Sequence, residues 1–447
     1  MSRWTMSYFA VALVFLVAGE TMMVAGYGYP AAPIEAPETL ALVHIIVVGW
    51  LSLLMCGALL QFVPVLVARP LAGERLALPA LVLITGGVSA LIIGLAGLGT
   101  AFIAPLALAG GAILLIAGFL TVGAAYAATL FAARPLPLPA LFVAVGLAAL
   151  SAAMLLGGIF AFALSGFTEN GSAITLLAGG LPLHAVFGLG GWLTFTTMGV
   201  SYRLLTMFLL APELVRRTSR CVWMSGCFGL GAVTGAGFLV LAGSPGTTLL
   251  AVAGLAGFLT VGLYGADILA IYRARKRRDI ELNSRVSIVA FVALIASALL
   301  LAGLVATNRL EEGVGALFYL VTFGWLTGLG LAQLYKIIPF LTWLEFYGPH
   351  IGRVHTPRVQ DLVVERRALV WFWLFQATVA VATLALLFGQ VSLFRLASLG
   401  QLVAILALII QFARARLLKD VQAPLLPPAG SLRPNLFLPA SVPRNPK

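Results

Sequence analysis

Twelve long apolar stretches follow one another along the 447 residues of this chain, and they restrict its fold more than any other feature. A helix needs about 20 apolar residues to cross roughly 30 Å of hydrocarbon, and only helices or closed barrels satisfy their backbone polar groups there. These stretches lack the alternation of barrel strands, so we expect an all-α membrane protein. Its twelve transmembrane helices are predicted at 6–29, 39–66, 77–101, 106–131, 138–165, 179–211, 221–243, 247–272, 286–306, 313–344, 368–388 and 394–415.

The basic residues are distributed unevenly over the loops between these helices. If the N-terminus is cytoplasmic, all but four of the 27 Lys and Arg fall on the cytoplasmic side, the exceptions being Arg203, Arg309, Lys336 and Arg395. Membrane proteins concentrate Lys and Arg in their cytoplasmic loops. We therefore expect a multi-pass protein of a bacterial-type inner membrane with both termini cytoplasmic. The net charge of +12 then reflects orientation and contact with the anionic lipid bilayer, and it does not indicate a nucleic-acid partner.

A tryptophan motif occurs three times, each time in one of the longest predicted helices. The copies are GWLSLLMCGALLQFVP from Gly49, GWLTFTTMGVSYRLLT from Gly191 and GWLTGLGLAQLYKIIP from Gly324. In each copy the eleventh residue after the tryptophan is long and polar: Gln61, Arg203 and Lys336. The copies are too far apart for a solenoid and indicate one large unit used three times.

Each copy falls in the second helix of a group of four, which predicts three four-helix repeats. Repeats with an even number of helices keep the same orientation in the membrane, so they are related by a pseudo-threefold axis along the membrane normal. The predicted units are 1–135, 136–282 and 283–420, followed by a Pro-rich, disordered cytoplasmic tail at 421–447.

This plan resembles the large subunit of haem-copper oxidases, whose twelve helices form three arcs of four. It also resembles the NnrS-type membrane haem and copper proteins. The local resemblance is carried by His44-Ile-Ile-Val-Val-Gly49-Trp50, by Leu183-His184 with Gly191-Trp192, and by the stretch 335–343. It implies a haem b or a copper ion as cofactor and a respiratory or redox subunit as partner.

Candidate metal or haem ligands lie in the predicted outer half of the membrane. Imidazole is a common ligand of haem iron and copper, and thioether sulfur suits Cu(I). His44 lies six residues before its tryptophan and His184 eight, and a two-residue shift turns a helical side chain by about 200°. Either the two histidines serve different sites, or the glycine pair at 190–191 hides a local distortion. The candidate ligands are His44, His184, Glu20, Met22 and Met23.

A second polar group lies at the predicted cytoplasmic ends of the spans. Arg203 and Lys336 lie about 33 Å along helices that start outside, at 1.5 Å per residue. They are interpreted as snorkelling anchors, or alternatively as contacts for an anionic lipid, a haem propionate or an anionic substrate. Asp267 lies near the same face and could pair with either.

The ligand set of an oxygen-reducing oxidase is incomplete in this sequence. The predicted seventh span contains no histidine, and the tenth reads Ala316-Leu317-Phe318-Tyr319-Leu320 where that family has histidines. The other two histidines, His350 and His355, fall in a cytoplasmic loop. Tyr319 stands where His44 stands relative to its tryptophan, so it is a packing residue or a tyrosine ligand.

These observations favour a haem- or copper-binding membrane protein of oxidase-like fold that does not reduce oxygen. Its role would be electron transfer, metal handling or a response to nitric oxide, and whether it is an enzyme stays open. One alternative is a small-molecule or ion transporter, with the outer and inner polar groups at the two ends of a path. Another is a membrane scaffold without a cofactor.

Overall fold

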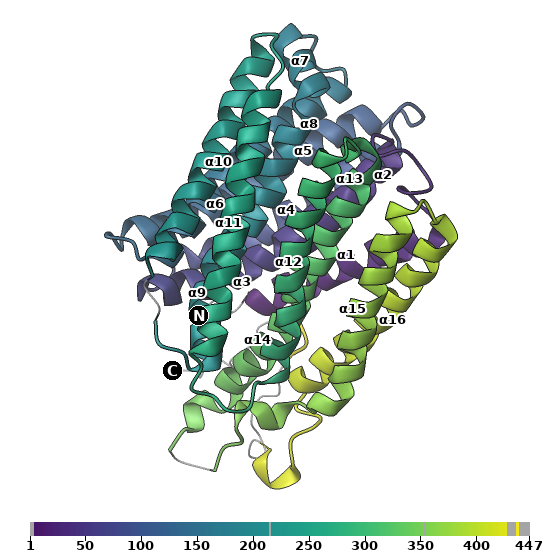
Figure 1. Ribbon diagram of the computed structural model, residues 1–447. Helices are drawn as coiled ribbons and strands as arrows, with labels where there is room; N and C mark the ends of the chain where they lie inside the picture. Colours follow the sequence, from purple (N-terminus) through teal and green to yellow (C-terminus); the bar gives the residue numbers. More distant parts are fainter. Residues whose placement is uncertain (1–3, 214–215, 353–354, 427–434, 438–447) are drawn as a thin grey trace, which may run out of the picture.

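The computed structural model of the protein describes residues 4–213, 216–352, 355–426 and 435–437. The described residues form helices and turns without strands (Figure 1). Within these described ranges, eleven helices are long and apolar enough to span a membrane, and a bent pair adds a twelfth span. The spans are α1 (Thr5–Ala25); α2 (Pro37–His44), η1 (Ile45–Ser52) and α3 (Leu53–Val67); α4 (Ala77–Ala96); α5 (Ala104–Phe131); α6 (Leu138–Leu164); α8 (Leu181–Ala185), η3 (Val186–Phe195) and α9 (Thr196–Leu209), preceded by α7 (Gly171–Gly179); α10 (Arg217–Leu241); α11 (Thr247–Arg273); α12 (Leu282–Ala306); α13 (Leu310–Tyr319), η4 (Leu320–Thr327) and α14 (Gly328–Phe346); α15 (Glu365–Leu387); and α16 (Val391–Arg416).

The all-α fold with twelve spans is confirmed, and several helix ends differ from the prediction by a few residues. The first helix ends at Ala25 because Gly26 adopts a left-handed conformation with φ of 81° and donates its N–H back to the helix. The sixth span begins with the separate helix α7, which is bent by 67° against the following one. Gly180 and Pro182 lie at that break. Proline interrupts a helix interior and is favoured at a helix start, which explains why a new helix begins here.

Each of the three tryptophan motifs begins in a π-helical segment. The Gly-Trp pairs fall within η1, η3 and η4, which are eight, ten and eight residues long, and the rest of each motif continues into the α-helix that follows. Such π-helical segments are rare and frequently occur at functional sites. Gly49 lies so close to α1 that a Cβ there would be 2.6 Å from the Phe15 ring. The local helix distortion expected at the glycine pair 190–191 is thus present as a π-helical segment in all three copies of the motif.

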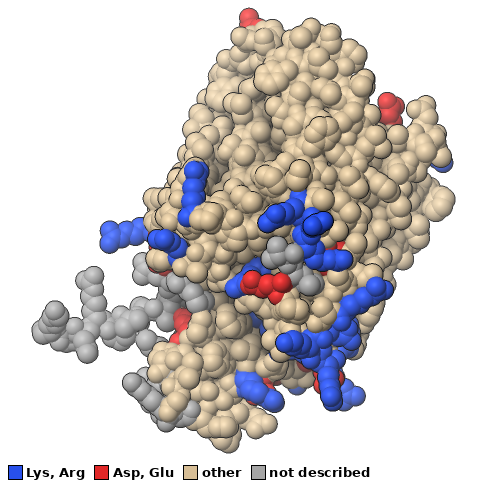
Figure 2. Space-filling view, turned by 60° about the vertical axis from the view of Figure 1, so that its left-hand side comes forward, with Lys and Arg blue, Asp and Glu red and all other residues tan. Residues whose placement is uncertain are grey.

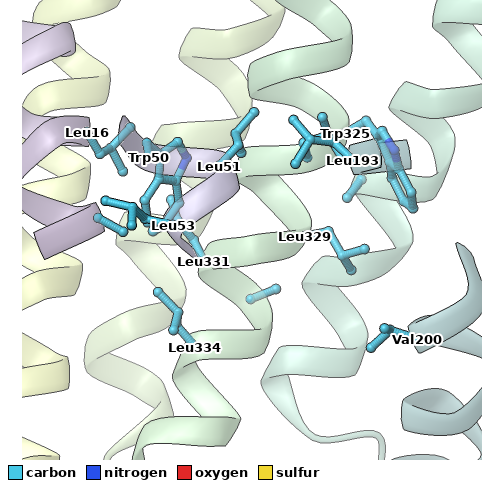
Figure 3. Close-up of a cluster of buried hydrophobic side chains, with 14 of the residues drawn as sticks. Leu16, Trp50, Leu51, Leu53, Leu193, Val200, Trp325, Leu329, Leu331 and Leu334 are labelled. Carbon is cyan, nitrogen blue, oxygen red and sulfur yellow. The ribbon is translucent and has the colours of Figure 1, made fainter. Parts of the chain in front are cut away.

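The tryptophans link the three copies through hydrogen bonds at the centre of the protein. Trp50 Nε1 donates to Thr327 at 2.9 Å, and Trp192 Nε1 donates to Ser52 at 3.1 Å. In both cases the acceptor lies two residues after the tryptophan of a neighbouring copy. The equivalent third acceptor is Thr194, but Trp325 Nε1 is buried without a hydrogen-bond partner among the described residues. Figure 3 shows Trp50 and Trp325 on neighbouring helices within this core.

The helix packing follows the same threefold plan. The third and fourth helices of each group form the most extensive pairs: α4 with α5, α10 with α11, and α15 with α16. Figure 1 shows the last two pairs at opposite edges of the bundle. The residue boundaries 1–135, 136–282 and 283–420 remain predictions.

The described part of the C-terminal tail, 421–426 and 435–437, lies against the helix ends. Tyr347 donates to the Leu425 carbonyl at 2.9 Å, and Ser7 donates to the Phe437 carbonyl at 2.5 Å. The disorder predicted for the other tail residues concerns positions outside the described ones. Figure 2 shows Lys and Arg gathered over the lower part of the molecule.

Candidate functional site

His44 and His184 lie close together, although they belong to different repeats. His44 is the last residue of α2, and His184 lies in α8, so each imidazole comes just before a π-helical segment. The two ring centroids are 6.3 Å apart, and the ring planes differ by 28°. The two histidines therefore share one site.

The unequal distances from the two tryptophans are what a shared site requires. Equivalent side chains of neighbouring repeats point in directions about a third of a turn apart around the pseudo-threefold axis. A site between the first and second repeats must use different faces of the two second helices. The two-residue shift and the longer π-helical segment of η3 provide that change of face.

Each histidine is held by a backbone carbonyl through the same ring nitrogen. His44 Nδ1 is 2.7 Å from the Leu40 oxygen, and His184 Nδ1 is 3.0 Å from the Ala153 oxygen. A carbonyl can only accept, so each Nδ1 carries the proton and donates. Nε2 of both rings then keeps its lone pair, which is the tautomer that metal-ligating histidines use.

Gly157 makes the second of these hydrogen bonds possible. It lies one helical turn after Ala153 on α6, where a side chain would cover the Ala153 carbonyl. A Cβ at Gly157 would be 3.0 Å from His184 Cε1. The missing side chain therefore gives the imidazole room to reach the carbonyl.

Both histidines line a cavity of about 330 Å³ between the first two repeats. A volume of this order suits a small molecule or part of a cofactor. The lining is mostly apolar and comes from α4, α5 and α6 as well as from the two histidine-bearing helices. Met154 and Glu35 also line the cavity, and sequence reasoning identified neither of them. In the sequence, the one indication that Met154 faces the site is its position three residues before Gly157, on the same face of the helix.

The 6.3 Å between the ring centroids matches the separation of two imidazoles that hold one metal atom between them. Two metal–nitrogen bonds of about 2 Å place the ring centroids about 6 Å apart. Among the described residues, no group of three or more His, Cys, Asp and Glu is close enough to hold a bare ion. A haem needs only axial ligands from the protein because the porphyrin supplies four nitrogens, so the pair suits a haem better than an isolated copper ion.

The structure does not place the other predicted outer ligands at this cavity. Glu20, Met22 and Met23 are absent from its lining, and Glu20 and Met23 are buried elsewhere in the protein core. Tyr319 is also remote from the pair, and its hydroxyl donates to Gln401 at 2.8 Å. The geometry thus favours the packing interpretation of Tyr319.

The predicted inner group separates into three ion pairs. Arg203 pairs with Glu213, Lys336 pairs with Glu281 at 2.6 Å, and Asp267 lies 3.5 Å from Arg216. Asp267 therefore pairs with neither of the two expected partners. Each of the three side chains has a protein partner of opposite charge, and contact with lipid or a small anion stays a prediction.

Asp267 is the most extensively hydrogen-bonded member of the inner group. It accepts from Tyr202 at 2.9 Å, from Thr218 at 2.5 Å and from Ser219 at 2.8 Å. These partners lie on the sixth and seventh spans, and Asp267 itself lies on the eighth. A buried carboxylate satisfied in this way joins helices.

The chain is an integral membrane protein with the fold of haem-copper oxidases. Among solved structures it is similar to a haem-copper terminal oxidase determined by cryo-EM as a dimer, with a TM-score of 0.64. The sequences are 13% identical over 99% of this chain and 86% of that chain, which shows the fold alone. No protein-family model and no curated protein matches the sequence.

Proposed function

We propose that this protein binds one b-type haem between His44 and His184 and transfers electrons within the membrane. The observation that carries the proposal is the imidazole pair. Its ring centroids are 6.3 Å apart, and both Nδ1 atoms donate hydrogen bonds to backbone carbonyls. A redox subunit or a small electron carrier would be its partner.

The paired histidines favour electron transfer over the binding or reduction of oxygen or nitric oxide. A haem supplies a one-electron redox centre when it is bound. His44 and His184 would hold the haem through their Nε2 atoms, and a haem held by two histidines would supply electron transfer and leave no position for oxygen or nitric oxide. The protein's own contribution is to hold both rings in the Nε2-accepting tautomer and to surround them with apolar side chains. This agrees with the incomplete histidine set of the later spans.

The orientation forms part of the proposal. The basic end of the molecule would face the cytoplasm of a bacterial-type cell. The cavity would then lie towards the outer face of the inner membrane.

An absorption spectrum of the purified protein tests the proposal, recorded oxidised and after reduction, with metal analysis of the same sample. We expect a Soret band, one iron per chain, and loss of the band in both His44→Ala and His184→Ala. His355→Ala is the matched control because His355 lies exposed in a loop, and it should keep the band. Copper without a Soret band would assign the pair to copper, and a colourless, metal-free protein would favour a scaffold or a transporter.

A further inference from the structure

Glu20 is a buried carboxyl group for which the haem proposal has no use. Its side chain is fully buried within a predicted membrane span, and neither oxygen has a hydrogen-bond partner among the described residues. An ionised carboxylate without a partner is costly in an apolar interior, so such a group is kept as a neutral acid. Acidic residues inside membrane spans commonly mark ion or proton pathways.

The packing of α1 against α16 places Glu20 and Gln401 at the same depth in the protein. Gly26 and Arg395 meet at the outer ends of these helices, where a Cβ on Gly26 would be 3.3 Å from the guanidinium. Glu20 lies six residues inward from Gly26, and Gln401 lies six residues inward from Arg395. At 1.5 Å per residue, both positions are about 9 Å deeper and hence at the same depth.

Tyr319 completes this group. Its phenol donates to Gln401 Oε1 at 2.8 Å, which leaves the buried Gln401 Nε2 without a partner among the described residues. The Glu20 carboxyl lies within electrostatic reach of the same phenol. Three polar side chains from three helices thus lie near one another in an apolar core, where Tyr319 contacts Gln401 and both Glu20 oxygens stay without a partner among the described residues.

The pseudo-threefold axis relates this group to the haem cavity. The cavity lies between the second, third and fourth helices of the first repeat and the first and second helices of the second repeat. Tyr319 is on the second helix of the third repeat, Gln401 on its fourth, and Glu20 on the first helix of the first repeat. Tyr319 also occupies the position of His44 relative to the tryptophan. The polar group therefore occupies the corresponding place at another repeat boundary.

Few charged or titratable side chains lie near Glu20 on the helices that pack against it. Arg395 is held at the outer end of α1, where its Nε donates to the Val24 carbonyl at 3.0 Å, about 6 Å along the axis from Glu20. The π-helical segment η1 packs on the same part of α1, and it presents Ile45 and Ile46 to Gly19. No cation therefore pairs with Glu20 among the described residues.

Tyr29 connects this group with the outer surface. It is partly exposed, and its ring and hydroxyl lie where a Cβ on Gly315 would be. Gly315 is one turn outward from Tyr319 on α13. Burial raises the pKa of the Tyr29 phenol, so it stays protonated and able to pass a proton on.

We propose that Glu20, Tyr319 and Gln401 form a proton-binding site inside the membrane, which exchanges its proton with the outer face past Tyr29. The site takes a proton and not a metal ion because no cluster of three or more ligating side chains surrounds it in the described part of the chain. It is independent of the haem proposal, since none of its three members lines the haem cavity.

Infrared spectroscopy of the full-length protein at neutral pH tests the site. We expect the carbonyl-stretch band of a protonated carboxylic acid, which moves to lower frequency after transfer to D₂O. Glu20→Gln should remove the band, whereas Glu311→Gln, which changes an exposed carboxyl near the outer end of α13, should keep it. A wild-type spectrum without this band, or a band unchanged in Glu20→Gln, overturns the proposal.

Two further variants keep the test decisive if Glu20→Gln does not fold. Tyr319→Phe removes the donor to Gln401 and should shift the frequency of the band; an unchanged frequency contradicts the assignment. Tyr29→Phe keeps the ring packed beside Gly315 and should slow the deuterium shift without removing the band. An unchanged exchange rate contradicts the route past Tyr29.

Discussion

Gly157 controls the position of the His184 ring, because a side chain there would occupy the space through which the imidazole reaches the Ala153 carbonyl. We predict that Gly157→Val displaces the ring and weakens haem binding on the order of 10- to 100-fold, the usual effect of losing a group that orients a ligand. Haem titration of purified apoprotein measures this affinity. Gly110→Val is the matched control, since no atom lies within 4 Å of a Cβ at that membrane position. Equal affinities in the two variants would contradict the role of Gly157.

Single residues of the site were partly predictable from the sequence. His44 and His184 stood out because histidine is rare in this chain and each precedes a tryptophan motif. Their convergence could not be deduced, because π-helical turns change which face a residue occupies and leave no clear mark in composition. The placement of Glu20, Met22 and Met23 away from the cavity depends on helix rotation, which packing sets.

At the scale of helices, the tryptophan hydrogen bonds join the second spans of different repeats. We predict that Trp50→Phe and Trp192→Phe each lower stability by about 1 kcal/mol more than Trp325→Phe, because only the first two lose a hydrogen bond. All three tryptophans are almost fully buried, so the loss of packing is comparable. Thermal unfolding in detergent measures the difference. A Trp325→Phe variant as unstable as the other two would show that these bonds contribute nothing measurable.

Glu281 joins the start of α12 to α14 through Lys336 and to the following loop through Gln360. Burial alone would raise the pKa of this carboxyl, but Lys336, Gln360 and Arg277 together hold it below its ordinary value of 4.5. Its contribution to stability is therefore fully present above pH 4.5 and is lost as the pH falls through the lowered pKa.

We accordingly predict that the difference in melting temperature between the wild type and Glu281→Gln is largest near neutral pH and shrinks below pH 4.5. Glu312→Gln serves as the control because it breaks only an exposed pair with Arg309, and such pairs contribute little. A difference that stays constant across this pH range would contradict the role of Glu281.

For the whole molecule, the fold was predictable and the orientation can be tested directly. Hydropathy predicts all twelve spans because lipid leaves the backbone no other way to satisfy its polar groups, and the motif spacing predicts the threefold plan. Cys221 is exposed near the start of α10, at the basic end of the molecule. We predict that a membrane-impermeant thiol reagent labels it in inside-out vesicles but not in intact spheroplasts, with Cys221→Ser as the control. Labelling in spheroplasts instead would reverse the orientation.

The measurement that tests the central claim most directly is a cryo-EM map of the protein purified from haem-replete cells. The central claim is that neighbouring repeats supply one imidazole each to a single group between them. We predict planar density in the cavity, joined on opposite faces to the His44 and His184 rings. Acyl-chain density in the cavity, or a haem bound to other residues with this pair unligated, would contradict the account.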